Sequence, residues 1–493
     1  MKRLLSILII LSLLLSFVGC KMDSNNSSEN NSGDGNENTT PEDKNENTPV
    51  ETPININGVS IKEYNIVCDS EGLDYNIRAA EYIRDKIYAL TNCTVPIVDD
   101  SETTKAREIV VGETSREISQ ELDTDTEGFD FAMLAKDGSV ALEADYFAIA
   151  AAAYYFVDTC ISGGDKEISN GTTVRAPITK EAKNFILLIG DGMGVYQTKL
   201  YEYMNSVADY NDGDDYSDGE DFFYGYMFPS ITYSRTNSYS GVTDSAAGGT
   251  ALATGYKTWN EYVGLDKDGN EIKSLTELAG ELGKATAVMS TETNTGATPS
   301  SFSAHETSRD ESSKIRDDQA ALTEKYGTII ECNFNYYTSR YMRTSVEKRI
   351  SDTLAQLDKD EDGFFMMYEE AHIDKHCHNE DMESTFKALV RFNQAIARFM
   401  EYAFYNPDTV VIITADHETG GLLPGDEGGL AYTSSGTHTG ADVPVFAYGY
   451  GTEIFDDNAV IENIDIAKFF ASKMGVNNFG DQTNDWYDEI YGG

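Results

Sequence analysis

The chain has 493 residues, which is too long for one ordinary hydrophobic core and predicts two or three domains. Its formal net charge is -47, which excludes a protein that binds the nucleic-acid backbone, because phosphate contacts require clustered Lys and Arg. An enzyme this acidic that acts on anionic substrates needs local positive charge from metal ions or from a placed arginine.

Residues 1–20 have the pattern of an export signal. A basic start is followed by an apolar stretch, Leu4 to Val18, that is short for a bilayer span and ends in small residues before Cys20. The letters F-V-G-C resemble the lipobox of bacterial lipoproteins, although Phe17 stands where Leu is usual. The resemblance implies cleavage before Cys20, lipidation of its sulfur and a lipoprotein anchored at the cell surface or in the periplasm. An ordinary signal peptide is the alternative.

Residues 21–52 are mostly Asn, Ser, Glu and Gly, with almost nothing to bury. Such a segment stays disordered, with a coil span of roughly 30 Å. We therefore expect a tether between the anchor and the folded part of the chain.

Residues 53–178 predict a small α/β domain, because apolar strands alternate with helical patterns. The expected elements are a strand in 60–68, a helix over 75–92, a strand over 107–112, a hairpin over 129–144 and a helix over 145–161. The stretches 108–117 and 138–156 resemble the N-terminal domain of α-glucuronidases and related carbohydrate-active enzymes. That resemblance implies attachment to a glycan or a partner, and a domain that only supports its neighbour is the alternative. Cys68 and Cys93 could pair in an exported protein, but the sequence does not decide this.

Residues 179–493 predict a larger α/β domain with a mostly parallel sheet that helices cover on both sides. Helical patterns, such as 385–403, separate its apolar runs, which are 184–190, 285–290, 364–368, 409–414 and 444–449. Ligands of such sheets lie beyond the carboxyl ends of the strands. Carboxylates and imidazoles gather at these ends in the numbers that a multi-metal site requires: Asp191, Glu369, Asp374, His378, Asp416, His417 and His438. Taken singly, an Asp after a strand can also be a helix cap.

Residues 243–255, TDSAAGGTALATG, predict a helix whose small residues leave its N-terminus open to close approach. Backbone N–H groups and the helix dipole favour an anion there, so Ser245 is a candidate nucleophile for an incoming phosphoryl group. The alternative is that Ser245 or Asp244 only caps the helix.

These residues carry a resemblance to the alkaline phosphatase family. The motifs GDGMG, TDSAAGGTALATG, ATPSSFSAHETSR, EEAHIDKHCH, TADHETG and THTG occur in the family's order between about residues 184 and 440. The resemblance implies a three-layer α/β sandwich that holds two zinc ions and one magnesium ion above its sheet.

Position by position, the resemblance implies a role for each site residue. The first zinc would take Asp374, His378 and His438, and the second zinc would take Asp191, Asp416 and His417, with Ser245 as an exchangeable ligand. Magnesium would take Asp191, Thr298 and Glu369. Arg309 would grip two phosphate oxygens, and Lys375 would contact phosphate through water. In many members the residue two before Thr298 is Asp or His, whereas this chain has Gly296, which leaves the identity of the third metal open.

The activity implied is hydrolysis of small phosphate monoesters through a phosphoserine at Ser245. One alternative is a phosphodiesterase or sulfatase of the wider superfamily, although the sulfatase motif C/S-x-P-x-R is absent from the sequence. Another is an inactive, surface-tethered binding protein, which should have lost at least one zinc ligand. The oligomeric state stays open, with a homodimer as one option.

Two acidic segments also resemble metal loops. Asp358, Asp360, Asp362, Gly363 and Glu369 match the spacing of a helix-loop-helix calcium loop. Such a loop needs a helix after it, whereas residues 364–368 are apolar throughout, so we expect Glu369 at the end of a strand. A weak surface calcium site at Asp358, Asp360 and Asp362 remains the alternative. The acidic segment 209–221 is expected to be solvated.

Overall fold

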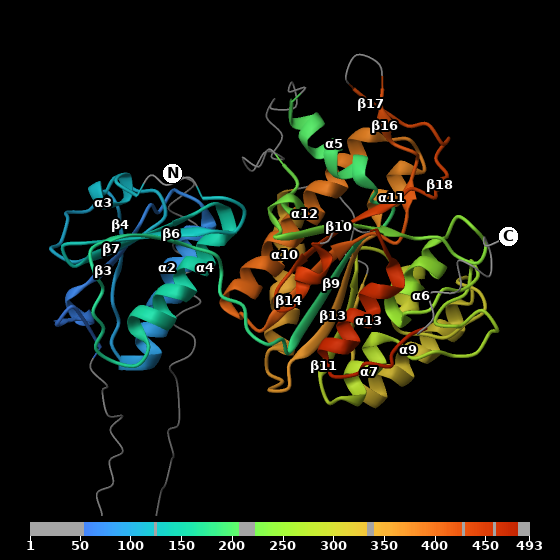
Figure 1. Cartoon of the computed structure of the whole chain (residues 1–493), viewed down its shortest axis with the longest axis horizontal. Coiled ribbons are helices and arrows are strands. Elements are labelled where there is room, and N and C mark those ends of the chain that lie inside the picture. The colour runs from blue at the N-terminus through green and yellow to red at the C-terminus, as the bar shows by residue number, and fades with distance from the viewer. Residues whose placement is uncertain are drawn as a thin grey trace, which may run out of the picture. The chain divides into compact units, whose positions relative to one another are not determined.

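The computed structural model describes residues 54–122, 126–206, 222–332, 340–425, 429–456 and 460–481. Residues 51–493 form one compact unit, in which two large β-sheets carry the fold (Figure 1). The predicted signal peptide with Cys20, the tether and the segment 209–221 lie outside the described residues. No helix within the described ranges is both long and apolar enough to cross a bilayer.

The smaller sheet has six strands in the order β4-β3-β5-β7-β6-β8. They are β3 (Asn65–Cys68), β4 (Ile97–Asp99), β5 (Glu108–Val111), β6 (Phe131–Lys136), β7 (Ser139–Ala144) and β8 (Gly171–Arg175). The first four strands in that order run parallel, and β6 is antiparallel to both of its neighbours. The predicted hairpin is confirmed as β6–β7, which turns at Asp137 and Gly138 with the positive φ angles of a tight hairpin turn.

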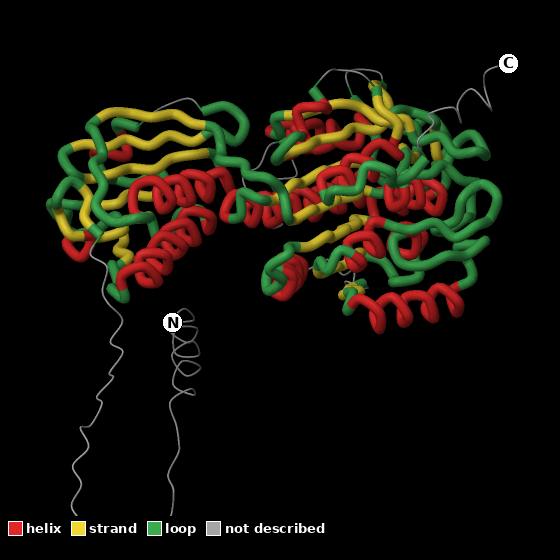
Figure 2. Tube along the Cα trace, turned by 60° about the horizontal axis from the view of Figure 1, so that its bottom comes forward, coloured by secondary structure: helices red, strands yellow, loops and turns green. Residues whose placement is uncertain are grey.

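Helices pack on this smaller sheet, as Figure 2 shows in red beside the yellow strands. They are α2 (Asp74–Thr91) and α4 (Ile149–Tyr155), which a π-helical turn, η3 (Phe156–Ile161), continues. Shorter elements complete the region: β1 (Asn55–Ile56), β2 (Val59–Ser60), η1 (Ile61–Glu63), α3 (Glu117–Gln120) and η2 (Tyr146–Ala148). Cys68 and Cys93 are both free thiols, so the disulfide that the sequence left open is not formed.

The larger sheet has eight strands in the order β12-β11-β13-β9-β14-β19-β10-β20. They are β9 (Asn184–Gly190), β10 (Ser230–Arg235), β11 (Ala285–Ser290), β12 (Ile329–Glu331), β13 (Phe364–Glu370), β14 (Thr409–Thr414), β19 (Val443–Tyr448) and β20 (Ile461–Glu462). The five strands from β12 to β14 are parallel, whereas β19 is antiparallel to both β14 and β10. The short pairs β15 (Glu418–Thr419) with β18 (His438–Thr439) and β16 (Leu423–Pro424) with β17 (Leu430–Ala431) lie outside it.

Both faces of the larger sheet are buried, because alternate side chains of each strand enter different helix layers. On β9, Ile186 and Leu188 pack with α5 (Val195–Ser206), α10 (Arg340–Leu357) and α12 (Met382–Tyr405). Phe185, Leu187 and Ile189 pack with α6 (Ser245–Thr254), α7 (Leu275–Glu281) and α13 (Asn463–Lys473). The predicted α/β sandwich of three layers with a mostly parallel sheet is confirmed. Its shorter helices are α8 (Ala297–Ser301), α9 (Ser312–Tyr326), α11 (His372–Cys377), η4 (Tyr224–Met227) and η6 (Thr452–Phe455).

The helix α12 joins the two sheets. It contacts α4 and η2 of the smaller region as well as strands of the larger sheet. Tyr82 of α2 stacks on Tyr405 with ring centroids 4.2 Å apart, and Arg78 Nε lies 2.7 Å from a Glu401 carboxylate oxygen. One hydrophobic cluster therefore spans both sheets, and the domain boundary predicted at residue 178 stays a prediction.

The structure decides between the two interpretations of residues 358–369. The segment after α10 is a turn in which Gly363 has φ 82°, and β13 follows it directly. Glu369 lies on that buried strand, so the strand interpretation is confirmed and the helix-loop-helix calcium loop is wrong. Asp358, Asp360 and Asp362 are not among the groups of described residues whose ligand atoms converge.

Candidate metal centre

The polar side chains of the candidate site lie at the carboxyl ends of the parallel strands of the larger sheet. Ile189 of β9, which lies two residues before Asp191, pairs in register with Glu369 of β13. On its other side Ile189 pairs with Thr414 of β14, which lies two residues before Asp416. The carboxyl ends of β13, β9 and β14 therefore lie side by side. This arrangement places Asp191, Glu369 and Asp416 at a common edge, as the strand-end argument predicts.

The structure brings together the group Asp374, His378 and His438, whose ligand atoms lie within 4.8 Å of one another. Asp374 is on α11 and His378 follows one helical turn later, so both face the same side. His378 Nε2 lies 3.2 Å from Asp374 Oδ2, and His438 Nε2 lies 3.5 Å from Asp374 Oδ1. The other ring nitrogens face backbone carbonyls, His378 Nδ1 at 2.5 Å from Gly436 O and His438 Nδ1 at 3.0 Å from Thr243 O. Such bonds leave Nε2 as the ligating atom.

A second group consists of Asp191, Asp416 and His417, again with ligand atoms within 4.8 Å of one another. His417 Nε2 is 3.3 Å from Asp416 Oδ2 and 3.6 Å from Asp191 Oδ1. Burial lowers the pKa of His417, which favours the neutral imidazole that a metal binds. Its ring stacks on that of His438 with centroids 3.7 Å apart, so the two groups are adjacent.

Thr419, which the sequence analysis did not single out, links the two groups. Its hydroxyl donates to Asp374 Oδ1 at 2.6 Å and lies 3.1 Å from His417 Nδ1. The hydroxyl can accept a hydrogen bond from a protonated Nδ1, which leaves His417 Nε2 free to ligate. Burial alone raises the pKa of Asp374, but the imidazoles of His378, His438 and His417 and the Thr419 hydroxyl together bring it well below its ordinary range.

Several buried oxygens of these residues have no hydrogen-bond partner within the described part of the chain. They are Asp191 Oδ1, Thr298 Oγ1, Glu369 Oε1 and Asp416 Oδ2. Burial and then the charges of Asp416, Asp374 and Glu369 raise the pKa of Asp191 well above its ordinary value, and burial raises that of Glu369 to about 8. Unpaired buried carboxylates are costly unless cations neutralise them. The donor set therefore fits divalent metal ions, with imidazole suited to zinc and hard oxygens suited to magnesium.

Ser245 lies beside the second group. It is the first residue of α6 and is buried, and its Oγ is 3.2 Å from His417 Nε2. Asp244 caps the helix by accepting from the backbone N–H of Ala247 at 2.9 Å. Its other oxygen accepts from Arg309 Nη1 at 3.3 Å. The capping alternative thus applies to Asp244, which also holds the Arg309 guanidinium next to Ser245.

Lys375 forms an ion pair with Glu292, a residue that the sequence analysis did not single out. Glu292 lies just beyond β11, in a bend before α8, and Gly296 is the N-cap of that helix. No motif pointed to Glu292, because it belongs to none of the matched stretches. The proposed lipidation site, Cys20, lies outside the described residues.

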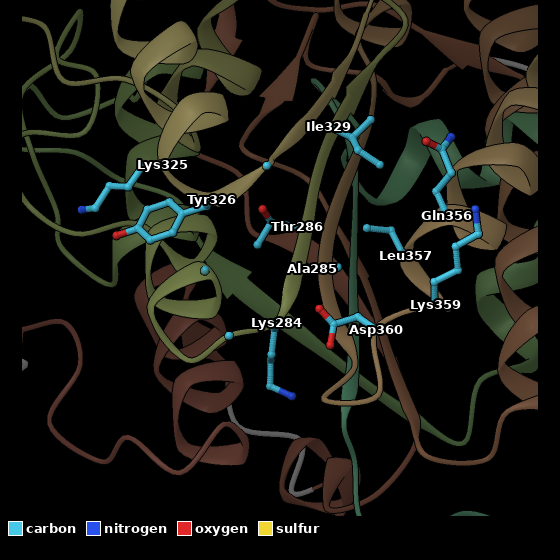
Figure 3. A pocket seen from close by; sticks show the side chains of 13 residues that line it. Lys284, Ala285, Thr286, Lys325, Tyr326, Ile329, Gln356, Leu357, Lys359 and Asp360 are labelled. Carbon is cyan, nitrogen blue, oxygen red and sulfur yellow. The ribbon is translucent and has the colours of Figure 1, made fainter.

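A separate cavity of about 540 Å³ lies at the opposite edge of the same sheet, where β11 and β12 begin. Lys284, Lys325 and Lys359 line it, but Figure 3 shows their side chains pointing in different directions. Lys284 donates to the Lys183 carbonyl at 3.0 Å, and Lys325 lies over the Tyr326 ring. The lysines therefore do not converge on one ligand position, unlike the residues at the carboxyl edge.

A family model described as alkaline phosphatase matches residues 182–337 and 330–432, which is just over half of the chain. The chain belongs to the alkaline phosphatase family. The matched region contains every predicted metal ligand except His438, together with Ser245 and Arg309. The family-level prediction is confirmed, and with it a hydrolase of a metal-binding family. The resemblance of residues 53–178 to α-glucuronidase domains stays a prediction.

This alkaline phosphatase family member is similar to two alkaline phosphatases of Bacillus subtilis (strain 168). It is 30% identical to alkaline phosphatase 3 over 298 residues, which cover 50% of this chain and 63% of that relative. It is 27% identical to alkaline phosphatase 4 over 317 residues, which cover 54% of this chain and 68% of the relative. The crystal structure of Thermus thermophilus alkaline phosphatase aligns with a TM-score of 0.52 at 16% identity, covering 64% of this chain and 96% of that one. That likeness shows the shared fold.

Proposed function

We propose that this protein is an exported phosphomonoesterase that hydrolyses small phosphate monoesters through a phosphoserine at Ser245. The observation that carries the proposal is the position of the Ser245 hydroxyl. It lies 3.2 Å from His417 Nε2 of the second group of candidate metal ligands, and the preceding residue, Asp244, accepts a hydrogen bond from Arg309. A hydroxyl in such surroundings is a nucleophile for phosphorus.

In this proposal Asp374, His378 and His438 hold one zinc ion, Asp191, Asp416 and His417 hold a second, and Asp191, Thr298 and Glu369 hold magnesium. When bound, such ions make an oxygen nucleophile available near neutral pH and offset negative charge on the attacking and leaving oxygens. The cations also supply the positive charge that a protein with net charge -47 lacks.

The chain's own residues position the substrate for the reaction. The Arg309 guanidinium presents parallel N–H donors to two phosphate oxygens, a geometry that lysine does not offer. Ser245 Oγ gives its proton to solvent and forms a bond to phosphorus while the ester P–O bond breaks and the alcohol leaves with a proton from solvent. Water then bonds to phosphorus as the Oγ–P bond breaks, so that Ser245 Oγ regains a proton and inorganic phosphate leaves. Positioning and electrostatic stabilisation supply most of the catalysis in phosphoryl transfer.

The test of the nucleophile is Ser245→Ala. The variant should hydrolyse p-nitrophenyl phosphate at least about 1,000-fold more slowly than the parent, because no phosphoserine can form. Metal analysis of the same preparation should still find two zinc ions per chain, since the six zinc ligands are unchanged. Hydrolysis at a near-parental rate would refute the assignment of Ser245.

The substrate class is tested by comparing rates on a monoester, a diester and an aryl sulfate. The monoester is preferred in this proposal, because it offers three non-bridging oxygens, two for Arg309 and a third for the metal ions, whereas a diester offers only two. A diester preference would replace the proposal with a phosphodiesterase. The rival of an inactive, surface-tethered binding protein is disfavoured because none of its six zinc ligands is missing from the sequence.

Export and anchoring rest on the sequence of residues 1–20. Cleavage before Cys20 would tether the enzyme through a lipid, with residues 21–52 as a spacer. Membrane-fraction enzyme should become soluble in a Cys20→Ser variant, and metabolic labelling with palmitate should be lost with it. Retention of the label in that variant would contradict the anchor. The small α/β domain would then act at the same surface, by supporting the enzyme or by binding a glycan.

A further inference from the structure

Glu418 lies in the two-residue strand β15, directly after His417 of the second group and before Thr419. Side chains alternate between the two sides of a strand. Thr419 faces the candidate ligands, because its hydroxyl contacts Asp374 and His417. Glu418 therefore points the other way, and it meets Gln197 of α5. Its side chain is buried, with 4% exposed, and a buried carboxylate is costly unless hydrogen-bond donors surround it.

Four donors of this chain surround the Glu418 carboxylate. Oε1 accepts from Gln197 Nε2 at 2.7 Å and from the Leu422 backbone N–H at 3.2 Å. Oε2 accepts from the Gly421 backbone N–H at 3.2 Å and from the Thr439 hydroxyl. Neutral donors thus satisfy both oxygens, so this carboxylate is not itself a candidate metal ligand.

The bond from Thr439 joins the strands that carry one imidazole of each group. In the antiparallel pair of β15 with β18, Glu418 lies opposite Thr439. In the same pair Thr419 lies opposite His438, which belongs to the first group. Glu418 directly follows His417, and Thr439 directly follows His438, so this side-chain bond fixes the two imidazoles relative to each other.

The chain leaves space for the Glu418 side chain at the start of α5. A Cβ at position 194, three residues after Asp191, would lie only 2.2 Å from Glu418 Cγ, so the glycine there makes room for the carboxylate. Gln197 Nε2, besides its bond to Glu418, donates to the Thr419 carbonyl at 2.8 Å. The segment that follows Asp191 therefore packs directly on Glu418 and on β15.

We propose that Glu418 is a positioning residue that sets the separation of the two groups of metal ligands, an inference that rests on the metal arrangement of the proposed function. Glu418 holds β15 to β18 and to α5, and it touches none of the reacting atoms. Hydrogen-bond partners behind the ligands fix the orientation of ligating imidazoles, and their loss weakens metal binding by about 10- to 100-fold. Both zinc ions should be affected, because Glu418 acts on His417 and on the strand of His438.

The test measures the two zinc dissociation constants of the full-length protein by competition with a chromogenic chelator. Glu418→Gln keeps the shape of the side chain but replaces one acceptor oxygen by an NH₂ donor, so two of the four donors lose their acceptor. Both constants should weaken by about 10-fold or more, and the visible absorption bands of the Co²⁺-loaded protein should shift. Values of both constants within twofold of the parent would overturn the proposal.

Glu108→Gln is the matched control for the loss of a buried carboxylate. Glu108 is 3% exposed and lies on β5 of the smaller sheet, where its Oε2 accepts from Arg116 Nε at 2.9 Å. This variant should unfold at a lower urea concentration than the parent but keep both zinc constants and the Co²⁺ spectrum. Equal losses of zinc binding in the Glu108 and Glu418 variants would reduce the role of Glu418 to general stability.

Thr439→Val decides the question if Glu418→Gln does not fold. It removes only the hydroxyl that reaches Glu418 from β18 and should weaken one of the two zinc constants by roughly 3- to 10-fold. Unchanged constants in this variant would refute the link between the strands, and a parent that binds no zinc would overturn the positioning role. A parent that binds two zinc ions but does not hydrolyse p-nitrophenyl phosphate would refute only the proposed function.

Discussion

Some side chains at the candidate metal centre make two separate contacts, each with a different role. Asp244 caps α6 with one carboxylate oxygen and holds Arg309 with the other. Thr419 donates to a ligand of the first group and contacts the imidazole of the second. Removing either side chain would therefore disturb two neighbouring functions at once, and their separate contributions need not add.

The role of Arg309 is tested by Arg309→Lys, which keeps the charge but loses the planar fork. Inhibition by inorganic phosphate should weaken by about 10- to 100-fold, since a charge-assisted hydrogen bond contributes about 1.5–3 kcal/mol. The measurement is the inhibition constant of phosphate in the p-nitrophenyl phosphate assay. Arg84→Lys, on the exposed side of α2, is the control and should leave that constant unchanged. An unchanged constant in Arg309→Lys would mean that phosphate is held elsewhere.

The convergence of Asp191, Glu369 and Asp416 could be predicted from the sequence, because each lies at or just after the end of an apolar run and parallel strands end together. Asp191 and Asp416 are examples, with strands that pair in register two residues earlier. The sequence did not reveal Glu292, or the contact that Thr419 makes with both Asp374 and His417. Both depend on a contact between segments that are distant along the chain, Glu292 with Lys375 and Thr419 with Asp374, and no local pattern encodes such a contact.

For the strands, burial is easier to predict from the sequence than whether a strand runs parallel or antiparallel to its neighbours. The apolar runs at 184–190, 364–368 and 409–414 became the parallel strands β9, β13 and β14. The similar run at 444–449 became β19, which is antiparallel to β14. A fully apolar run indicates only that both faces are buried, so its direction has to come from the connections. The helix predicted over 145–161 likewise divides into η2, α4 and a π-helical turn.

The start of α7 depends on a half-buried pair of charges. Glu277 closes a capping box with Ser274, and its other oxygen lies 3.3 Å from His305 Nε2. His305 Nδ1 faces the Gly264 carbonyl at 2.9 Å, so both ring nitrogens have acceptors. Burial lowers the pKa of His305, but Glu277, the carbonyl and the charge of Glu271 together raise it to about 9. Asp318, which accepts from the His305 backbone N–H, adds a negative charge on the neighbouring helix α9.

This pair makes the stability of the protein depend on pH. A histidine whose folded pKa is raised stabilises the fold fully below its unfolded value of about 6.5, and that contribution is lost as the pH rises through about 9. The free energy of unfolding should thus fall between pH 7 and 9.5 by about 1–3 kcal/mol more in the parent than in His305→Gln. Urea unfolding at fixed zinc concentration measures the difference.

Glu277→Gln provides the control for the histidine. Glutamine keeps the capping box but removes the charge that His305 faces, so most of the extra pH dependence should disappear. The double variant His305→Gln/Glu277→Gln should then show no further decrease in the pH dependence of the free energy of unfolding. Equal pH slopes in the parent and in both single variants would contradict a charged His305.

At the scale of the whole molecule, the two sheets are packed as one body. Phe129 of the smaller region is buried among Phe228, Phe404 and Tyr448 of the larger one, with ring centroids between 5.1 and 5.7 Å. The pattern of apolar residues predicted two separate α/β regions, but it could not predict this contact. Aromatic residues that pack across regions look the same in sequence as those that pack within one.

Phe129→Ala should lower the free energy of unfolding by about 3–5 kcal/mol, the usual cost of a large cavity. Both tryptophans lie after residue 178, so fluorescence follows the larger region whereas circular dichroism follows both. The two signals should change together in the parent if the sheets unfold as one unit. Tyr88→Ala, at an exposed site of α2, should cost less than about 0.5 kcal/mol. Two separated transitions in the parent would show that the interface contributes little.

The ligands at the carboxyl edge come from distant parts of the chain. Asp191 follows the first strand of the larger sheet, whereas His438 precedes β19 near its end. A nascent chain that stops before residue 438 therefore lacks a complete first group, however well its earlier strands have paired. In the proposed function, the first zinc ion then binds only after almost the whole chain has been made.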